Sequence, residues 1–134
     1  MAKLLLMTHD GLLARAYQAR LAKEGFEIEH RTSAHDGLAR ARQWTPDVIL
    51  LDLTLPGMHG LDVLKMLRDV PWLATVHVVL LIERTLEREI LNECLLWGAD
   101  SYLEKDVCSI DQFVTHLQAV ARSLQTRRPT PQQN

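Results

Sequence analysis

Short apolar runs alternate along the chain with segments in which apolar residues recur every three or four positions. The apolar runs, together with one stretch that alternates apolar and polar residues, predict five strands: 3–7, 26–31, 47–52, 76–82 and 102–104. The helical spacing predicts five helices between and after them: 10–24, 33–44, 61–68, 86–97 and 109–124. The pattern therefore repeats a strand followed by a helix five times.

Strict alternation of strands and helices favours a parallel sheet with helices on both faces, a three-layer, doubly wound α/β fold. The run at 47–52 is apolar on both faces, which is typical of a central strand. In such sheets, chemistry lies beyond the carboxyl ends of the strands. The residues expected at that edge are Thr8, His9, Asp10, Asp52, Glu83 and Lys105.

Length and composition fit one globular domain. The chain has 134 residues, of which 47% are hydrophobic, and a formal net charge of −2, so we expect no nucleic-acid binding and no membrane association. No apolar run is long enough for a signal peptide or a membrane span, and we predict a cytoplasmic location. We expect residues 1–124 to form the domain and 125–134 to be a disordered tail or the start of a linker.

The stretch VILLDLTLPGMHG, residues 48–60, ends an apolar run on a carboxylate and then turns. An isolated ionised carboxylate is costly to bury. Asp52 is therefore expected at an edge where a negative charge or an attacking oxygen is needed.

These residues resemble the receiver domain of bacterial two-component response regulators, over positions 3 to about 124. The motifs that carry the resemblance are LDLTLPGMHGLDVLKMLR at 51–68 and WGADSYLEK at 97–105. The resemblance implies a flavodoxin-like sheet with strand order 2-1-3-4-5. It also implies that Asp52 accepts a phosphoryl group from a partner kinase, that Lys105 is its charge partner, and that Tyr102 is an aromatic switch residue.

The chain departs from the family at the metal site. The family holds Mg²⁺ with two acidic residues after the first strand, where this chain has Thr8 and His9. A neutral hydroxyl and an imidazole are poor ligands for Mg²⁺. We therefore expect Mg²⁺ binding to be weak or absent, and the candidate metal ligands are His9, Asp10, Asp52 and the backbone of Thr54.

Two further departures concern the switch. Glu83, or Ile82 if the count slips by one residue, stands where the family has Ser or Thr, and an ion pair between Glu83 and Lys105 is a hypothesis for locking one conformation. Asp106 follows Lys105, where the family usually has a proline after a cis peptide bond. Because a non-proline cis bond costs about 3 kcal/mol, a trans bond and an altered loop are expected.

We interpret the chain as an atypical receiver domain in a phosphorelay, not an enzyme, whose partner is a histidine kinase or another signalling protein. The alternative is a protein interaction module that works without phosphorylation. A small phosphatase or a flavin protein is disfavoured, because no glycine-rich phosphate loop follows the first strand. The candidate interface residues are Arg84, Arg88 and Tyr102, on the face of the last two helices and the fifth strand, where a homodimer is also expected.

Overall fold

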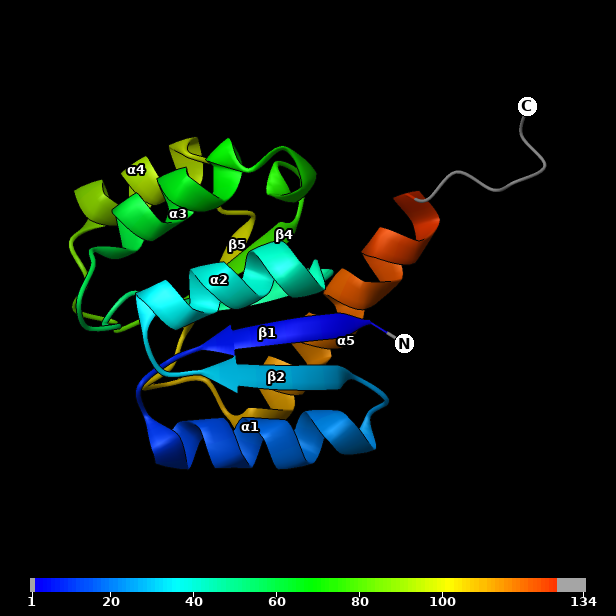
Figure 1. Cartoon of the computed structure of the whole chain (residues 1–134). Coiled ribbons are helices and arrows are strands. Elements are labelled where there is room, and N and C mark those ends of the chain that lie inside the picture. The colour runs from blue at the N-terminus through cyan, green and yellow to red at the C-terminus, as the bar shows by residue number, and fades with distance from the viewer. Residues whose placement is uncertain (1, 128–134) are drawn as a thin grey trace.

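Five parallel strands form one central sheet in the computed structural model, which describes residues 2–127 (Figure 1). The strands are β1 (Lys3–Met7), β2 (Glu27–Arg31), β3 (Val48–Asp52), β4 (His77–Ile82) and β5 (Ser101–Glu104). Their order is β2-β1-β3-β4-β5, and each adjacent pair is parallel. The predicted α/β fold with strand order 2-1-3-4-5 is therefore confirmed.

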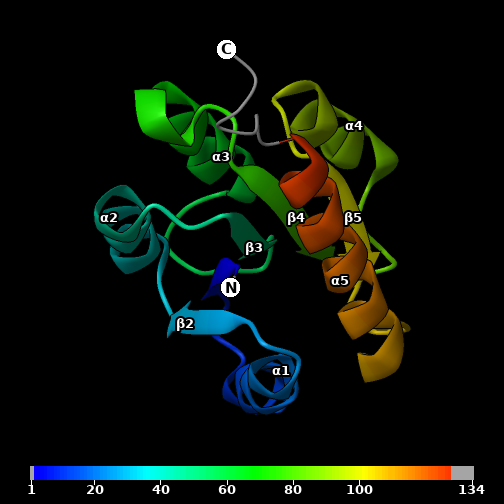
Figure 2. The ribbon, with the colours of Figure 1, turned by 90° about the vertical axis from the view of Figure 1, so that its right-hand side faces the viewer.

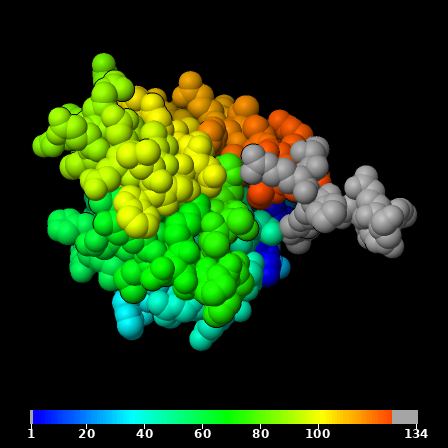
Figure 3. Space-filling model, turned by 90° about the horizontal axis from the view of Figure 1, so that it is seen from above, coloured from blue at the N-terminus to red at the C-terminus, as the bar shows by residue number. Residues whose placement is uncertain are grey.

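Five helices cover the sheet in two layers. They are α1 (Gly11–Lys23), α2 (Ala34–Trp44), α3 (Gly60–Asp69), α4 (Arg88–Leu96) and α5 (Ile110–Arg127), and a 3₁₀ turn, η1 (Pro71–Leu73), follows α3. Helices α1 and α5 lie on one face of the sheet, and α2, α3 and α4 lie on the other (Figure 2). Seen from above, α3 and α4 form one surface with α5 beside it (Figure 3).

The sheet separates two hydrophobic cores. Every residue of β3 is buried, with Ile49 and Leu51 in the core under α2, α3 and α4 and Val48 and Leu50 in the core under α1 and α5. In the second core the rings of Tyr17 and Phe113 stack with centroids 3.7 Å apart. A central strand covered on both sides explains why its sequence is continuously apolar.

The helix starts follow local hydrogen-bonding rules. Asp10 caps α1 by accepting from the Leu13 amide, and Ser33 caps α2 by accepting from the Asp36 amide, each at 3.1 Å. At the start of α5, Ser109 and Gln112 exchange two such bonds, a reciprocal cap that the sequence reading did not identify.

The last helix is longer than predicted. It continues through Arg127 instead of ending near residue 124, so the first part of the expected tail is helical. The rest of that expected tail, 128–134, lies outside the described residues. Within residues 2–127, no helix has the length and apolar character needed to cross a bilayer.

Candidate functional site

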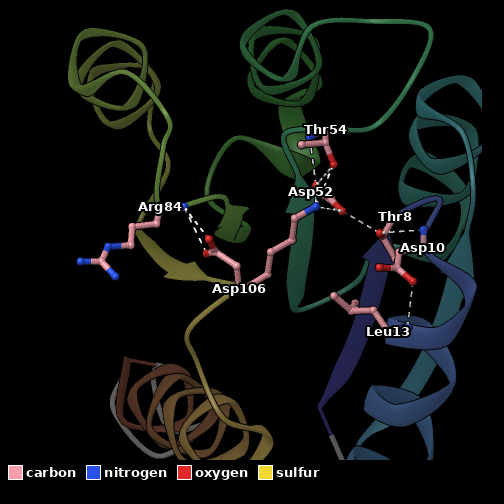
Figure 4. Close-up of polar contacts among 8 residues, drawn as sticks. Thr8, Asp10, Leu13, Asp52, Thr54, Arg84 and Asp106 are labelled. Carbon is pink, nitrogen blue, oxygen red and sulfur yellow. Dashed lines mark hydrogen bonds and ion pairs between the residues drawn. The ribbon is translucent and has the colours of Figure 1, made fainter.

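Of the polar residues predicted at the carboxyl edge, Thr8 and Lys105 contact Asp52. Figure 4 shows the Thr8 side chain directed at Asp52. Asp52 is the last residue of β3 and is fully buried, as is Thr8, which directly follows β1. Lys105 directly follows β5, and Thr54 lies in the loop after β3. Because the strands are parallel, their ends bring together residues that are far apart in the sequence.

Five hydrogen bonds surround the Asp52 carboxylate. Oδ2 accepts from the Thr8 hydroxyl at 2.7 Å, and Oδ1 accepts from the amide and hydroxyl of Thr54 at 2.9 and 2.7 Å. Lys105 Nζ donates to Oδ1 at 2.9 Å and to Oδ2 at 3.0 Å, and it also lies 2.8 Å from the Thr54 hydroxyl oxygen. The carboxylate is therefore held by groups from β1, the β3–α3 loop and the end of β5.

These contacts keep Asp52 ionised. Burial raises the pKa of the carboxyl group, but hydrogen bonds from Thr54, Thr8 and Lys105 outweigh that effect and hold the pKa below its ordinary value of 3.8. A buried charge is tolerated when it is paired and hydrogen-bonded. The site thus holds an oxygen anion whose countercharge is the ammonium group of Lys105.

The other residues predicted as metal ligands make different contacts or none with Asp52. The Asp10 carboxylate caps α1 through the Leu13 amide, and His9 is exposed. The Thr54 amide donates to Asp52. Within the described part of the chain, no three His, Cys, Asp or Glu side chains form a group that could hold a metal ion.

The predicted pair between Glu83 and Lys105 is wrong. Glu83 directly follows β4, as the sequence predicts, but its side chain is exposed. Lys105 forms its ion pair with Asp52, because it continues β5 toward the buried carboxylate. The backbone amide of Lys105 donates to the Ile82 carbonyl at 2.8 Å and so extends the pairing of β4 with β5.

The loop after Lys105 has the predicted trans peptide bond, since residues 2–127 contain no cis peptide. The carboxylate of Asp106 accepts from the backbone amide of Arg84, with oxygens at 3.1 and 3.4 Å (Figure 4). This contact ties the β4–α4 loop to the β5–α5 loop. The altered loop therefore connects the end of β5 with the segment that carries Glu83.

The three candidate interface residues line one surface groove. The groove has a volume of about 140 Å³ and lies between α4 and β5. Its lining consists of Ile82, Arg84, Leu86, Arg88, Leu91, Tyr102 and Glu104. The Tyr102 side chain is 42% exposed, so its ring is partly open to solvent at this groove.

Thr8 is the site residue that the sequence reading undervalued. The sequence predicts Thr8 at the sheet edge as a poor metal ligand, whereas its hydroxyl donates directly to Asp52. The signal that could have found it is positional. In the predicted strand order the first and third strands are neighbours, so residues just beyond their ends face each other.

Comparison with known proteins agrees with this fold. The family model described as "Response regulator receiver domain" matches residues 4–118. The chain is 34% identical over 122 residues to the transcriptional regulatory protein KdpE of Mycobacterium tuberculosis, covering 91% of this chain and 52% of that protein. It is 29% identical over 121 residues to the cell cycle transcriptional regulator CtrA of Caulobacter vibrioides, covering 90% of this chain and 50% of that protein.

A solved structure is similar over the whole domain. The chemotaxis response regulator CheY4 of Vibrio cholerae superposes with a TM-score of 0.83 at 26% identity, covering 90% of this chain and 98% of that one. The chain spans about half the length of the curated relatives it matches. The match to the family model, which spans most of the sequence, shows that this chain belongs to the family of response regulator receiver domains.

Proposed function

We propose that this domain receives a phosphoryl group on Asp52 from a phosphohistidine of a histidine kinase, in the cytoplasm. The observation that supports this proposal best is the buried, ionised Asp52 at the sheet edge, with Lys105 bonded to both of its oxygens. A carboxylate oxygen is the nucleophile of such a transfer. The lysine supplies the positive charge that a transferred phosphoryl group requires.

The contacts suggest how the carboxylate becomes reactive. A carboxylate offers about four lone-pair positions, and five donor contacts already fill them. The lysine ammonium is a point charge on a flexible stem, so it moves from Asp52 to the oxygens of the incoming phosphoryl group. A freed carboxylate oxygen then bonds to phosphorus as the bond from phosphorus to the histidine nitrogen breaks, and that nitrogen keeps the electron pair.

The family implies a Mg²⁺ ion at this site, but the residues present do not fit it. Mg²⁺ prefers hard oxygen ligands in octahedral geometry. Here the Thr8 hydroxyl hydrogen is directed at Asp52, the Asp10 carboxylate caps α1, and His9 is exposed. We propose that Mg²⁺ binds weakly or not at all, and the transfer described above uses only residues of this chain.

The output also differs from a hydroxyl switch. Glu83 offers no hydroxyl group to a phosphorylated Asp52, and Asp106 anchors the neighbouring Arg84 amide instead. We propose that protein partners, including a second copy of the chain, bind the groove that Arg88 and Tyr102 help to line. An effector domain in a longer protein is consistent with the greater length of the relatives.

Incubation with acetyl phosphate tests the proposed acceptor. The unmodified protein is expected to gain the mass of one phosphoryl group, and Asp52→Asn is expected to gain none, as measured by intact-mass spectrometry. Peptide mapping after borohydride reduction should place the label on Asp52. The absence of any label, with or without Mg²⁺ or Mn²⁺, would contradict the proposal and favour an interaction module that works without phosphate.

A further inference from the structure

We infer that Thr8 sets the cation requirement of the Asp52 site: its fixed hydroxyl supports the carboxylate in place of a divalent cation, and a carboxylate at this position would make the site cation-dependent. The part of this inference that concerns phosphoryl transfer rests on the proposed function. The part that concerns metal binding does not depend on the proposed function.

The backbone of Thr8 is fixed from both sides. Its amide donates to the carbonyl of Arg31 at 3.1 Å, continuing the ladder between β1 and β2. Its carbonyl oxygen lies 2.7 Å from Nε2 of His30, so the imidazole donates to it. The side chain itself is completely buried. The backbone that carries the Thr8 hydroxyl is therefore fixed against the neighbouring strand.

The direction of the hydroxyl hydrogen follows from its two partners. The amide of Asp10 lies 3.2 Å from Thr8 Oγ1 and is a donor, so the hydroxyl oxygen accepts there. The Asp52 carboxylate is ionised and only accepts, so the single hydroxyl hydrogen of Thr8 points to Oδ2, across 2.7 Å. Accepting from Asp10 polarises the hydroxyl group and strengthens its donation to Asp52.

A neutral donor and a cation serve Asp52 in different ways. The Thr8 hydroxyl offsets part of the negative charge on Oδ2 and brings no charge of its own, so the single ammonium of Lys105 balances the single carboxylate. An aspartate in the place of Thr8 would put a second carboxylate against Oδ2. Two carboxylates at such a distance share either a proton or a cation, and their oxygens are the ligands that Mg²⁺ and Mn²⁺ prefer.

The experiment compares the unmodified protein with Thr8→Asp. We expect the Mn²⁺ affinity of Thr8→Asp to exceed that of the unmodified protein by at least about tenfold, as measured by water proton relaxation. With acetyl phosphate, the extent of labelling of the unmodified protein in EDTA and in Mg²⁺ should agree to within about twofold. Labelling of Thr8→Asp should be about tenfold lower in EDTA than in Mg²⁺. Thermal melts verify that each variant is folded.

Two control variants separate charge from shape. Thr8→Val keeps the shape of the side chain without a hydroxyl or a charge, so it should gain no Mn²⁺ affinity. The double variant Thr8→Asp/Asp52→Asn should lose the gain, because one of the two carboxylates is gone. Unchanged Mn²⁺ affinity in Thr8→Asp, or labelling of the unmodified protein that requires Mg²⁺, would overturn the inference. If nothing is labelled, the proposed function fails, and the Mn²⁺ comparison still decides the role of Thr8.

Discussion

At the scale of single residues, the site depends on the buried, ionised carboxylate of Asp52. Asp52 is fully buried, and the energetic cost of removing its carboxylate from water is met by one ammonium group and by donors from two threonines. Charge-assisted hydrogen bonds of this kind are about twice as strong as bonds between neutral groups. The same contacts that allow burial also fix the direction in which each carboxylate oxygen points.

The low pKa of Asp52 predicts a dependence of stability on pH. The folded state favours the ionised form of Asp52. The contribution of this group to the unfolding free energy is therefore complete above the ordinary pKa of 3.8 and is lost as the pH falls through the lower pKa of the folded state. The difference in unfolding free energy between the unmodified protein and Asp52→Asn should therefore stay constant from about pH 7 to about pH 4 and change as the pH falls further, as measured by urea denaturation. Asp69→Asn, a change at an exposed position, serves as the control; an equal change there would contradict the assignment to Asp52.

At the scale of elements, the two loops beyond β4 and β5 act as one unit. Lys105 and Asp106 are adjacent, yet one reaches the buried carboxylate and the other holds the Arg84 amide. Their backbone is anchored by the bond from the Lys105 amide to the Ile82 carbonyl. We therefore expect that a displacement of Lys105 toward a phosphoryl group, as in the proposed function, would affect the segment that leads into α4.

Removal of the Asp106 carboxylate should loosen the β4–α4 loop. In Asp106→Ala we expect the Arg84 amide to exchange with solvent about tenfold faster, which corresponds to the loss of one hydrogen bond worth ~1.4 kcal/mol. Hydrogen exchange followed by NMR measures this directly. Asp106→Asn keeps an acceptor oxygen and is the matched control, with a smaller effect expected. Equal exchange at Arg84 in the unmodified protein and in Asp106→Ala would show that the carboxylate does not hold this loop.

The elements were predictable where local rules determine them. The caps at Asp10 and Ser33 and the apolar strands follow from short-range patterns, and the structure agrees with them. The turn at 71–73 was missed because three residues carry no periodicity. The last three residues of α5, 125–127, were not predicted to be helical because QTR has no apolar residue to extend the apolar stripe.

The sequence was sufficient to identify the central residues of the site but not all of their side-chain contacts. Asp52 and Lys105 could be identified from the order of strands and loops, and the structure brings them together. The wrong pairing of Glu83 arose because sequence places a residue at a strand end but does not give the direction of its side chain. The predicted strand order already makes β1 and β3 neighbours, but the direction of the Thr8 hydroxyl toward Asp52 depends on the assembled sheet.

At the scale of the whole molecule, the sheet is stabilised by a separate core on each face. Helix α5 supplies four buried side chains to the core that it shares with α1: Phe113, Val114, Leu117 and Val120. The burial of apolar surface is the main force that favours the folded state. Stability therefore depends on α5 as well as on the central strands.

Truncation of the stacked ring in this core should destabilise the entire domain. Phe113→Ala removes a fully buried ring and its stacking contact with Tyr17, so we expect a loss of about 3–5 kcal/mol in unfolding free energy. Urea denaturation followed by circular dichroism measures the loss. Val107→Ala is the control, because that side chain is 55% exposed and should cost less than about 1 kcal/mol. A similar loss in both variants would contradict the role given to this core.

The strand order also determines which backbone groups of the sheet lack a neighbouring strand. The two outer strands are β2 and β5, and β2 carries charged side chains at Glu27, Glu29 and Arg31, whereas β5 has only four residues. Charges along a margin and a short outer strand both hinder the addition of a foreign strand. This arrangement disfavours the pairing of two copies of the chain through their outer strands, so any self-association is expected at another surface.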